Sequence, residues 1–223
     1  MPFDAATLAF LLLLGGWVAA DGTGFGQIMI SRPLVAATLA GWLVGAPAAG
    51  AAAGLILEVF HLTVLPVGAA QYPESGPSAV VAGAVFAISD QNALLLLTAV
   101  GFSLVWERVS AASVRRLRQV NIRVIAAHDT DVESESRLER RHLVALLLDA
   151  CRGVLLVLTG ILILHALISL IPAPVSTGEQ LAARALHLFL IFVLAGALSL
   201  FGRRLRLVAA GAAFGFLILL LRT

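Results

Sequence analysis

Long apolar blocks separated by short polar breaks make up most of the chain. The first three blocks run from Ala5 to Ala20, from Ile28 to Val44 and from Ala48 to Leu65. A helix needs about 20 apolar residues to cross the hydrocarbon core of a bilayer, and each block has that length or nearly so. The pattern therefore predicts membrane-spanning helices, the second and third of them joined by a short turn at residues 45–47.

Two polar breaks interrupt the next part of the chain. Residues 66–77 contain three prolines and two glycines, a composition that cannot continue a helix, so an outside loop or a re-entrant segment is predicted there. Farther along, Asp90, Gln91 and Asn92 stand in the middle of the apolar run 78–106. Because lipid offers no hydrogen bonds, these residues indicate either two helices or one helix whose polar notch faces protein.

The block 107–142 is strongly charged, with eight arginines and six acidic residues. It is predicted to be an amphipathic helix with a loop, and its excess of arginine is typical of a cytoplasmic segment. Three further apolar runs follow, at 143–171, 181–201 and 207–221. The chain is therefore expected to have an N-terminal transmembrane region (1–106), a cytoplasmic segment (107–142) and C-terminal transmembrane helices (143–223).

The run 143–171 carries two charged residues near its start, Asp149 and Arg152. Its 29 residues would be about 43 Å long as a helix, which exceeds the thickness of the bilayer core. We therefore expect its first turns to lie at the membrane interface.

Composition and charge agree with a membrane protein. Of the 223 residues, 60% are hydrophobic and 13% charged, and the mean hydropathy is +1.00, whereas a soluble domain has about 25% charged residues. All 15 basic residues are arginine and the net charge is only +2, so the basicity indicates topology and contact with anionic lipid and not binding of nucleic acid. The expected fold is an all-α polytopic membrane protein with about seven hydrophobic segments, including a re-entrant or broken hairpin.

Small residues are spaced for close helix packing. Gly41 and Gly45 form one small-xxx-small pair, and Gly50 and Gly54 form another, in a stretch that is also rich in alanine. Such pairs let helix backbones approach closely inside a membrane.

Glu58 is the ionisable residue within these spans that points most directly to function, because a charge inside a bilayer is costly. His61 lies three residues later, on the same helical face. These residues are candidates to line a polar cavity, where carboxylates accept hydrogen bonds from the hydroxyls of a sugar. The broken segment would add polar side chains to it: Gln71, Tyr72, Glu74 and Ser75. The alternative is structural: Glu58 pairs with Arg32 or with a helix N-terminus.

Other chemistry has weaker support in the sequence. Glu58 and His61 also permit a proton-coupled carrier, which would depend on pH near the pKa of histidine. The second Glu-x-x-His pair, Glu139 and His142, lies in the charged block and is not expected to join the first in a metal site. The chain has no phosphate-binding loop or nucleophile motif. We therefore expect no metal, no cofactor and no self-contained enzyme.

A series of short motifs runs in order through the first 90 residues. It consists of Arg32-Pro33-Leu34-Val35, Leu39-x-Gly41, Gly45, Gly50, Gly54, Leu57-Glu58, Val67-Gly68-Ala69-Ala70 and Pro73-Glu74. In this order the motifs resemble the membrane component IIC of the mannose/fructose/sorbose family of the bacterial phosphotransferase system. The rest of the chain resembles that family only in hydropathy.

The resemblance implies a non-catalytic transport subunit in the bacterial inner membrane. It would form an oligomeric complex with a IID-like subunit, move a hexose inward, and deliver it to cytoplasmic IIB and IIA-like proteins for phosphorylation. On this basis Glu58 and Glu74 would hydrogen-bond the sugar, with Gln71 and His61 beside them. Arg32, Pro33, Gly68 and Pro73 would be structural or gating residues.

Four positions depart from the family pattern. Ala46 replaces an acid, His61 and Thr63 replace small residues, and Glu74 replaces the commoner aspartate. These departures motivate an alternative, in which the chain is a degenerate IIC-like protein that acts as a structural or regulatory subunit of another membrane complex.

Overall fold

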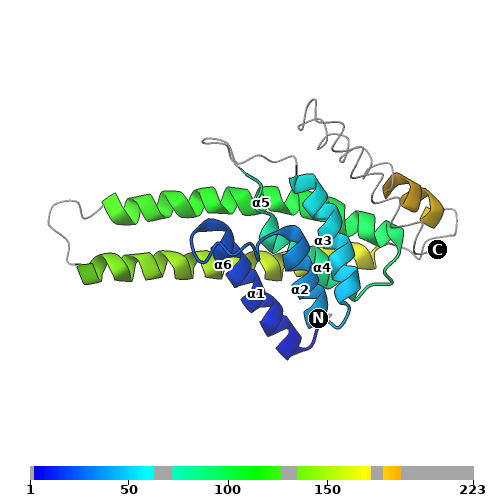
Figure 1. The fold of residues 1–223 in the computed structure, drawn as a ribbon, viewed down its shortest axis with the longest axis horizontal. Helices are drawn as coiled ribbons and strands as arrows, with labels where there is room; N and C mark the ends of the chain where they lie inside the picture. Colours follow the sequence, from blue (N-terminus) through cyan, green and yellow to red (C-terminus); the bar gives the residue numbers. More distant parts are fainter. Residues whose placement is uncertain (1–2, 63–71, 127–134, 172–177, 187–223) are drawn as a thin grey trace, which may run out of the picture.

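The part of the chain that the computed structural model describes, residues 3–62, 72–126, 135–171 and 178–186, is a bundle of helices without a strand (Figure 1). The helices are α1 (Ala5–Thr23), α2 (Pro33–Leu43), α3 (Pro47–His61), α4 (Ser75–Ala87), α5 (Ala93–Ala126) and α6 (Glu135–Ser169). Residues 178–186 form a further short helical stretch. The predicted all-α fold is confirmed.

Helix α4 lies at the centre of the bundle. It contacts α1, α2, α3, α5 and α6, and every residue from Gly76 to Ala87 is buried. Its sequence is apolar on all sides, which is typical of a helix that other helices surround. The polar residues that precede α4 are therefore held at a fixed place in the bundle.

Glycines set the distance between α2, α3 and α4. A Cβ atom built on Gly41 of α2 would lie 2.8 Å from the Cα of Gly50 in α3, and a Cβ on Gly54 would lie 2.7 Å from the carbonyl oxygen of Pro33. Where α4 packs on α2, a Cβ on Gly83 of α4 would lie 2.7 Å from the Cα of Ala37. The predicted close packing of small residues is confirmed, since these helices touch backbone to backbone.

Gly45 has a different role from the one its spacing predicted. Its φ angle is +84° and nothing lies within 4 Å of a Cβ built on it. It turns the chain between α2 and α3, where a positive φ favours glycine.

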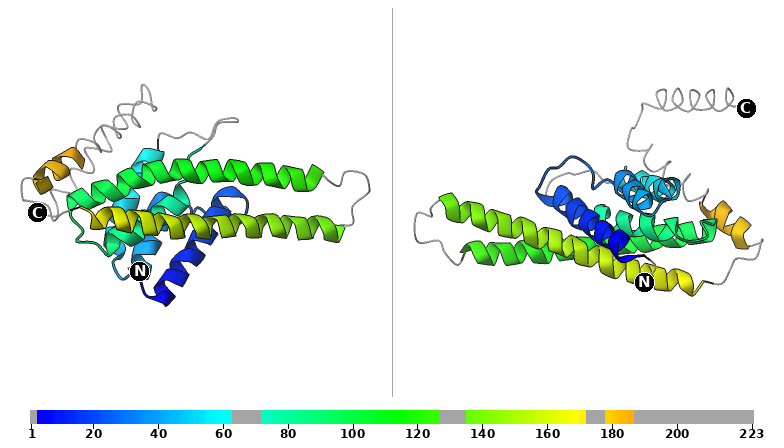
Figure 2. Two further views of the ribbon diagram at one scale, coloured as in Figure 1. Left: turned by 180° about the vertical axis from the view of Figure 1, so that it is seen from behind. Right: turned by 90° about the horizontal axis from the view of Figure 1, so that it is seen from below.

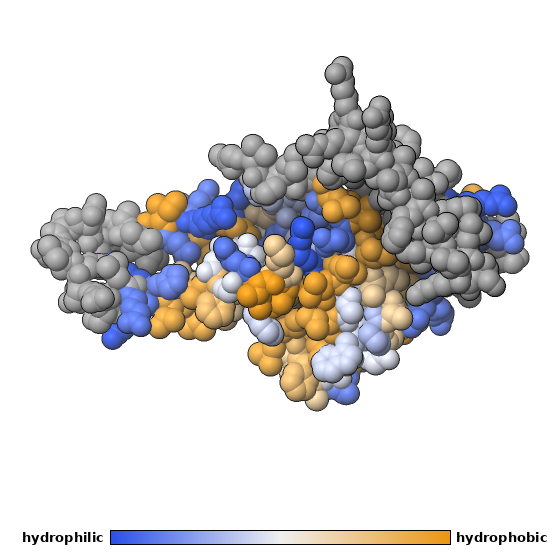
Figure 3. All heavy atoms as spheres, viewed as in Figure 1, coloured by the Kyte–Doolittle hydropathy of each residue, from blue (hydrophilic) through white to orange (hydrophobic). Residues whose placement is uncertain are grey.

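Helices α5 and α6 form a long antiparallel hairpin that extends beyond the other helices (Figures 1 and 2). Helix α1 packs across α6, where a Cβ on Gly153 would lie 2.5 Å from the Cβ of Ala19. Apolar side chains cover much of the face around α1, whereas polar and apolar side chains are mixed along the hairpin (Figure 3).

Three described helices are long and apolar enough to cross a membrane: Ala5–Thr23, Ala93–Ile122 and Glu139–Ser169. Helices α2, α3 and α4 are apolar but shorter, with 11, 15 and 13 residues. The predicted span 28–44 is therefore too long, because α2 covers only Pro33–Leu43. Of the predicted span 48–65, residues 48–61 belong to α3, and residues 63–65 lie outside the described residues. Of the predicted span 181–201, residues 181–186 are helical, and the rest lies outside the described residues, as does the whole predicted span 207–221.

The polar notch at residues 90–92 separates two helices. Helix α4 ends at Ala87, and α5 begins at Ala93 with the Asn92 side chain accepting a hydrogen bond from the backbone N–H of Leu95 at 2.9 Å. Glu179 accepts a further bond from the N–H of Ala93 at 2.7 Å. The sequence allowed either two helices or one helix with a polar notch, and the structure has two helices.

Candidate functional site

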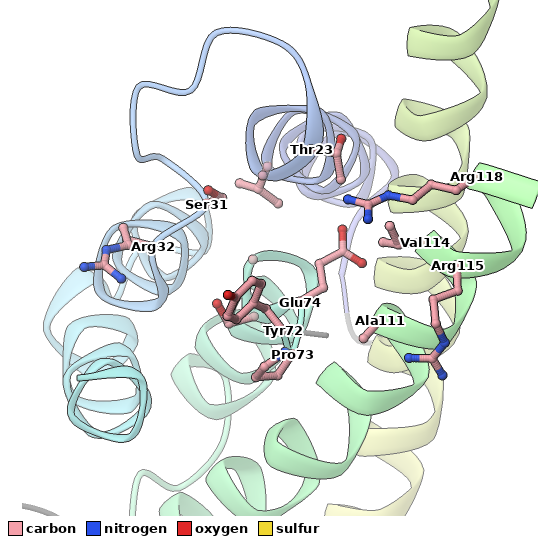
Figure 4. A pocket seen from close by; sticks show the side chains of 14 residues that line it. Thr23, Ser31, Arg32, Tyr72, Pro73, Glu74, Ala111, Val114, Arg115 and Arg118 are labelled. Carbon is pink, nitrogen blue, oxygen red and sulfur yellow. The ribbon is translucent and has the colours of Figure 1, made fainter. Parts of the chain in front are cut away.

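A polar cavity of about 420 Å³ lies where α1 ends, α4 begins and α5 passes (Figure 4). Side chains from four separate parts of the chain face it. Its lining comprises Val18, Gly22, Thr23, Ser31, Arg32, Tyr72, Pro73, Glu74, Ser75, Gly76, Ala111, Val114, Arg115 and Arg118. The volume is within the range of small-molecule sites, about 300–1,000 Å³.

Asp21 does not line this cavity but positions Ser31 and Arg32 in its wall. It is buried in α1, and its carboxylate accepts hydrogen bonds from the backbone N–H of Ile28 at 2.7 Å and from the N–H and hydroxyl of Ser31 at 3.0 and 2.8 Å. These bonds hold residues 24–32 in a compact turn in which Gln27 and Met29 have positive φ angles. Helix α2 therefore begins only at Pro33, and Ser31 and Arg32 face the cavity.

Among the described residues that line the cavity, Glu74 is the one acid. It is bound by an arginine that does not itself line the cavity. Arg152 Nη1 lies 2.5 Å from Glu74 Oε2, and Nη2 lies 2.6 Å from Oε1. The two side chains are only 10% and 11% exposed. This is a buried bidentate ion pair, the strongest geometry for arginine and a carboxylate.

Asp149 holds the other edge of Arg152. Its Oδ1 atom accepts from Arg152 Nε at 2.8 Å and lies 2.6 Å from Nη2, while its Oδ2 accepts from the hydroxyl of Thr23. The hydroxyl of Ser113 accepts a bond from Arg152 Nη1 at 2.9 Å. We call Arg152, Glu74, Asp149, Ser113 and Thr23 the arginine network; it joins α1, the start of α4, α5 and α6.

A second, smaller cavity of about 170 Å³ lies on the hairpin side of the first. The two share Thr23, Val114 and Arg118, and Asp149 lines the second. The arginine network thus lies between two cavities and places a carboxylate in the wall of each.

Glu58 contacts two partners in the part of the chain that the structure describes. Its Oε1 lies 3.3 Å from Arg32 Nε, and its Oε2 accepts a hydrogen bond from the N–H of Leu34 at the start of α2, also at 3.3 Å. Glu58 therefore pairs with Arg32 and with the N-terminus of a helix, as the structural alternative for this residue predicted. Glu58 is not in the cavity lining, although its partner Arg32 is.

His61 faces a different helix from Glu58. Its Nε2 lies 3.2 Å from Glu107 Oε2, and its Nδ1 lies 2.8 Å from the carbonyl oxygen of Leu57. Both side chains are buried. Glu107, which opens the charged block of the sequence, thus lies inside the bundle, and its backbone carbonyl accepts a bond from the N–H of Glu74 at 3.3 Å.

The structure brings only part of the predicted site together. Glu74, Pro73 and Arg32 line the cavity, together with Tyr72. Glu58 and His61 do not line it, and Pro33 is buried at the first turn of α2. Gln71 and Gly68 lie outside the described residues.

Sequence reasoning missed the partners of Glu74. Arg152 and Asp149 were assigned only a position at the membrane interface, with no partner, and the structure shows that their side chains are 10% and 8% exposed. Their spacing of three residues on one apolar helix, a pair of opposite charges on one face, was the available signal. Nothing in the spacing indicated that their third partner lies 78 residues earlier in the chain.

The fold and the cavity define a class of protein: a multi-pass helical membrane protein with a polar site inside its bundle. A solved structure described as "Structure of membrane protein" has this fold, with a TM-score of 0.74 and 16% sequence identity over 99% of this chain and 96% of its own. That similarity shows the fold alone.

A family model described as "PTS system sorbose-specific iic component" matches residues 6–213. The chain belongs to this family, as the order of motifs from Arg32 to Glu74 predicted. One relative is the "PTS system sorbose-specific EIIC component" of Klebsiella pneumoniae, which is 26% identical over 174 residues. That alignment covers 74% of this chain and 64% of the relative, so the chain spans less than two thirds of the relative's length.

Proposed function

We propose that this protein is the sugar-translocating IIC subunit of a mannose-family phosphotransferase system and that it binds a hexose in the cavity beside Glu74. The observation that carries the proposal is a carboxylate in the wall of a polar cavity inside a IIC-family bundle. A sugar hydroxyl donates to an ionised carboxylate in a short, charge-assisted bond.

The rest of the cavity wall supports a polyhydroxyl ligand. Ser75 and Arg118 add polar groups from α4 and α5, and Val18, Ala111 and Val114 add apolar surface. The Tyr72 hydroxyl is buried and has no hydrogen-bond partner among the described residues. A mixed lining of this kind suits a sugar, which presents hydroxyls at its edges and C–H groups on its faces.

The phosphotransferase assignment also proposes partners and a location. The bound hexose would pass to cytoplasmic IIB and IIA-like proteins, and a IID-like subunit would complete an oligomeric membrane complex. The protein would reside in the bacterial inner membrane among anionic lipids. The segment 107–142 would be cytoplasmic, between the transmembrane regions 1–106 and 143–223.

The test is uptake of labelled hexoses, with sorbose included because the relative is named for it, by cells that express this chain with IIA, IIB and IID partners. Glu74→Gln removes the charge and keeps the shape, so it should raise the apparent KM about ten- to hundredfold, the effect of losing a charged hydrogen bond of about 1.5–3 kcal/mol. Glu139→Gln is the matched control because Glu139 is exposed on the hairpin and lines neither cavity. It should leave the KM unchanged.

Two outcomes would contradict the proposal. One is the absence of uptake of any hexose by the wild type when all partners are expressed. The other is an unchanged KM in Glu74→Gln at equal amounts of folded protein. Glu74→Asp checks the folding of the site, because it keeps the charge and should retain measurable uptake.

A further inference from the structure

We propose that Arg152 is a positioning residue for the sugar: it holds the Glu74 carboxylate in the cavity wall and so sets the affinity of a site that it does not itself line. This inference rests on the proposed function of the cavity. It adds to that function a residue from α6, a helix that contributes nothing to the cavity lining among the described residues.

The two hydrogen bonds from Arg152 use only half of the hydrogen-bonding capacity of the Glu74 carboxylate. Each of its oxygens has two lone-pair directions, and Arg152 uses one on each oxygen through bonds of 2.5 and 2.6 Å. Because Glu74 lines the cavity, a sugar hydroxyl bound there could donate along a direction that Arg152 does not use. In Figure 4 the carboxylate of Glu74 lies within the cavity, near Thr23 and Arg118.

Arg152 is itself held in place. Asp149 binds Nε and Nη2, Ser113 binds Nη1, and Thr23 donates to the far oxygen of Asp149. The guanidinium is planar and presents its donors in a rigid fork, so these partners fix its orientation as well as its position. The orientation of Glu74 therefore depends on contacts from α1, α5 and α6.

A buried pair of this kind is not needed for stability alone. Replacing a buried ion pair and its partners with apolar side chains of similar volume is often neutral or stabilising. Arg152, which binds two buried carboxylates, does however hold the charged Glu74 side chain in one orientation inside an apolar bundle. A sugar site requires such a preorganised acceptor.

A substitution by lysine separates the effect of the positive charge of Arg152 from the effect of its planar, two-pronged geometry. Arg152→Lys keeps the positive charge but cannot bind both oxygens of Glu74 in parallel. Losing one such hydrogen bond should raise the apparent KM about tenfold, while the maximal rate per folded protein stays within about twofold. Ser113→Ala is a milder change in the same network and should raise the KM about threefold.

The decisive comparison repeats both substitutions in the Glu74→Gln background. If Arg152 acts through Glu74, the substitutions add less than about twofold to the KM there, because the effects of residues in one network are not additive. Arg116→Lys is the control; Arg116 is exposed on α5 and lines neither cavity, and its substitution should leave the KM unchanged in both backgrounds.

The outcomes separate this inference from the proposed function. If the wild type takes up no hexose with its partners, the proposed function fails and the positioning role fails with it. If the wild type transports, the inference alone is overturned by either of two results. One is a lowered maximal rate with an unchanged KM in both Arg152→Lys and Ser113→Ala. The other is a KM effect that persists at full size in Glu74→Gln.

Discussion

Replacing Gly83 with leucine is expected to leave little or no folded protein in the membrane. A Cβ atom at this position would lie 2.7 Å from the Cα of Ala37 and 2.9 Å from its carbonyl carbon. Both are backbone atoms of α2, so no side chain can move to relieve the contact. Overpacking commonly costs about 1–3 kcal/mol, and a contact between two backbones lies at or above the upper end of that range.

The measurement is the amount of monodisperse protein after extraction, followed by its melting temperature. Gly101→Leu is the control because Gly101 is also helical, in α5, and nothing lies within 4 Å of a Cβ built on it. It should behave as the wild type does. A Gly83→Leu variant with wild-type yield and melting temperature would show that α2 and α4 are not packed backbone to backbone.

Replacing Arg152 with leucine is the second large effect that we expect. It would leave two carboxylates, Glu74 and Asp149, buried without the cation that binds both. Removing one partner of a buried ion pair costs about 3–5 kcal/mol. The variant should therefore unfold at a markedly lower temperature, or fail to accumulate.

The triple variant Glu74→Gln, Asp149→Asn, Arg152→Leu separates the charge from the packing. It removes all three charges, so it should recover most of the stability that Arg152→Leu alone loses. Arg116→Leu, on the exposed face of α5, should have little effect. Equal melting temperatures for the single and the triple variants would contradict the arginine network as the origin of the loss.

The sequence was sufficient for the fold class because lipid imposes strict rules on it. Inside lipid, backbone groups must find their hydrogen bonds within the protein, so a chain with long apolar runs and few charges is expected to form helices. The small residues at helical spacing predicted the close packing observed at Gly41, Gly50 and Gly54. The predicted boundaries of the individual helices were less accurate than the fold class. Asp21 accepts hydrogen bonds from the backbone N–H groups of Ile28 and Ser31 and so holds residues 28–31 in a turn. The apolar run begins at Ile28, but its helix begins only at Pro33.

The site was predictable where its residues are local in sequence and unpredictable where they are not. Arg32, Pro73 and Glu74 were found through the motif series, and the Arg32 and Glu58 pair was one of two possibilities considered. His61 was grouped with Glu58 because it lies three residues later, yet it turns to Glu107 of α5. Which acid meets which base across the bundle depends on how α5 and α6 pack, and periodicity within one helix carries no information about that.

Whether a sugar occupies the cavity beside Glu74 can be tested directly by the access of a reagent to a thiol placed there. The single cysteine, Cys151, is exposed and can be replaced by serine to give a cysteine-free background. In that background Ser75→Cys places a thiol in the cavity lining, and Ser169→Cys places one on an exposed surface outside both cavities. A maleimide then reports on access to each thiol in purified protein in lipid nanodiscs.

We predict that a hexose carried by the system slows the labelling of Ser75→Cys in a saturable way and leaves the labelling of Ser169→Cys unchanged. Adding Glu74→Gln should shift the protecting concentration at least about tenfold higher. Labelling of Ser75→Cys at the same rate with and without every hexose that the cells take up would contradict the assignment of this cavity as the sugar site.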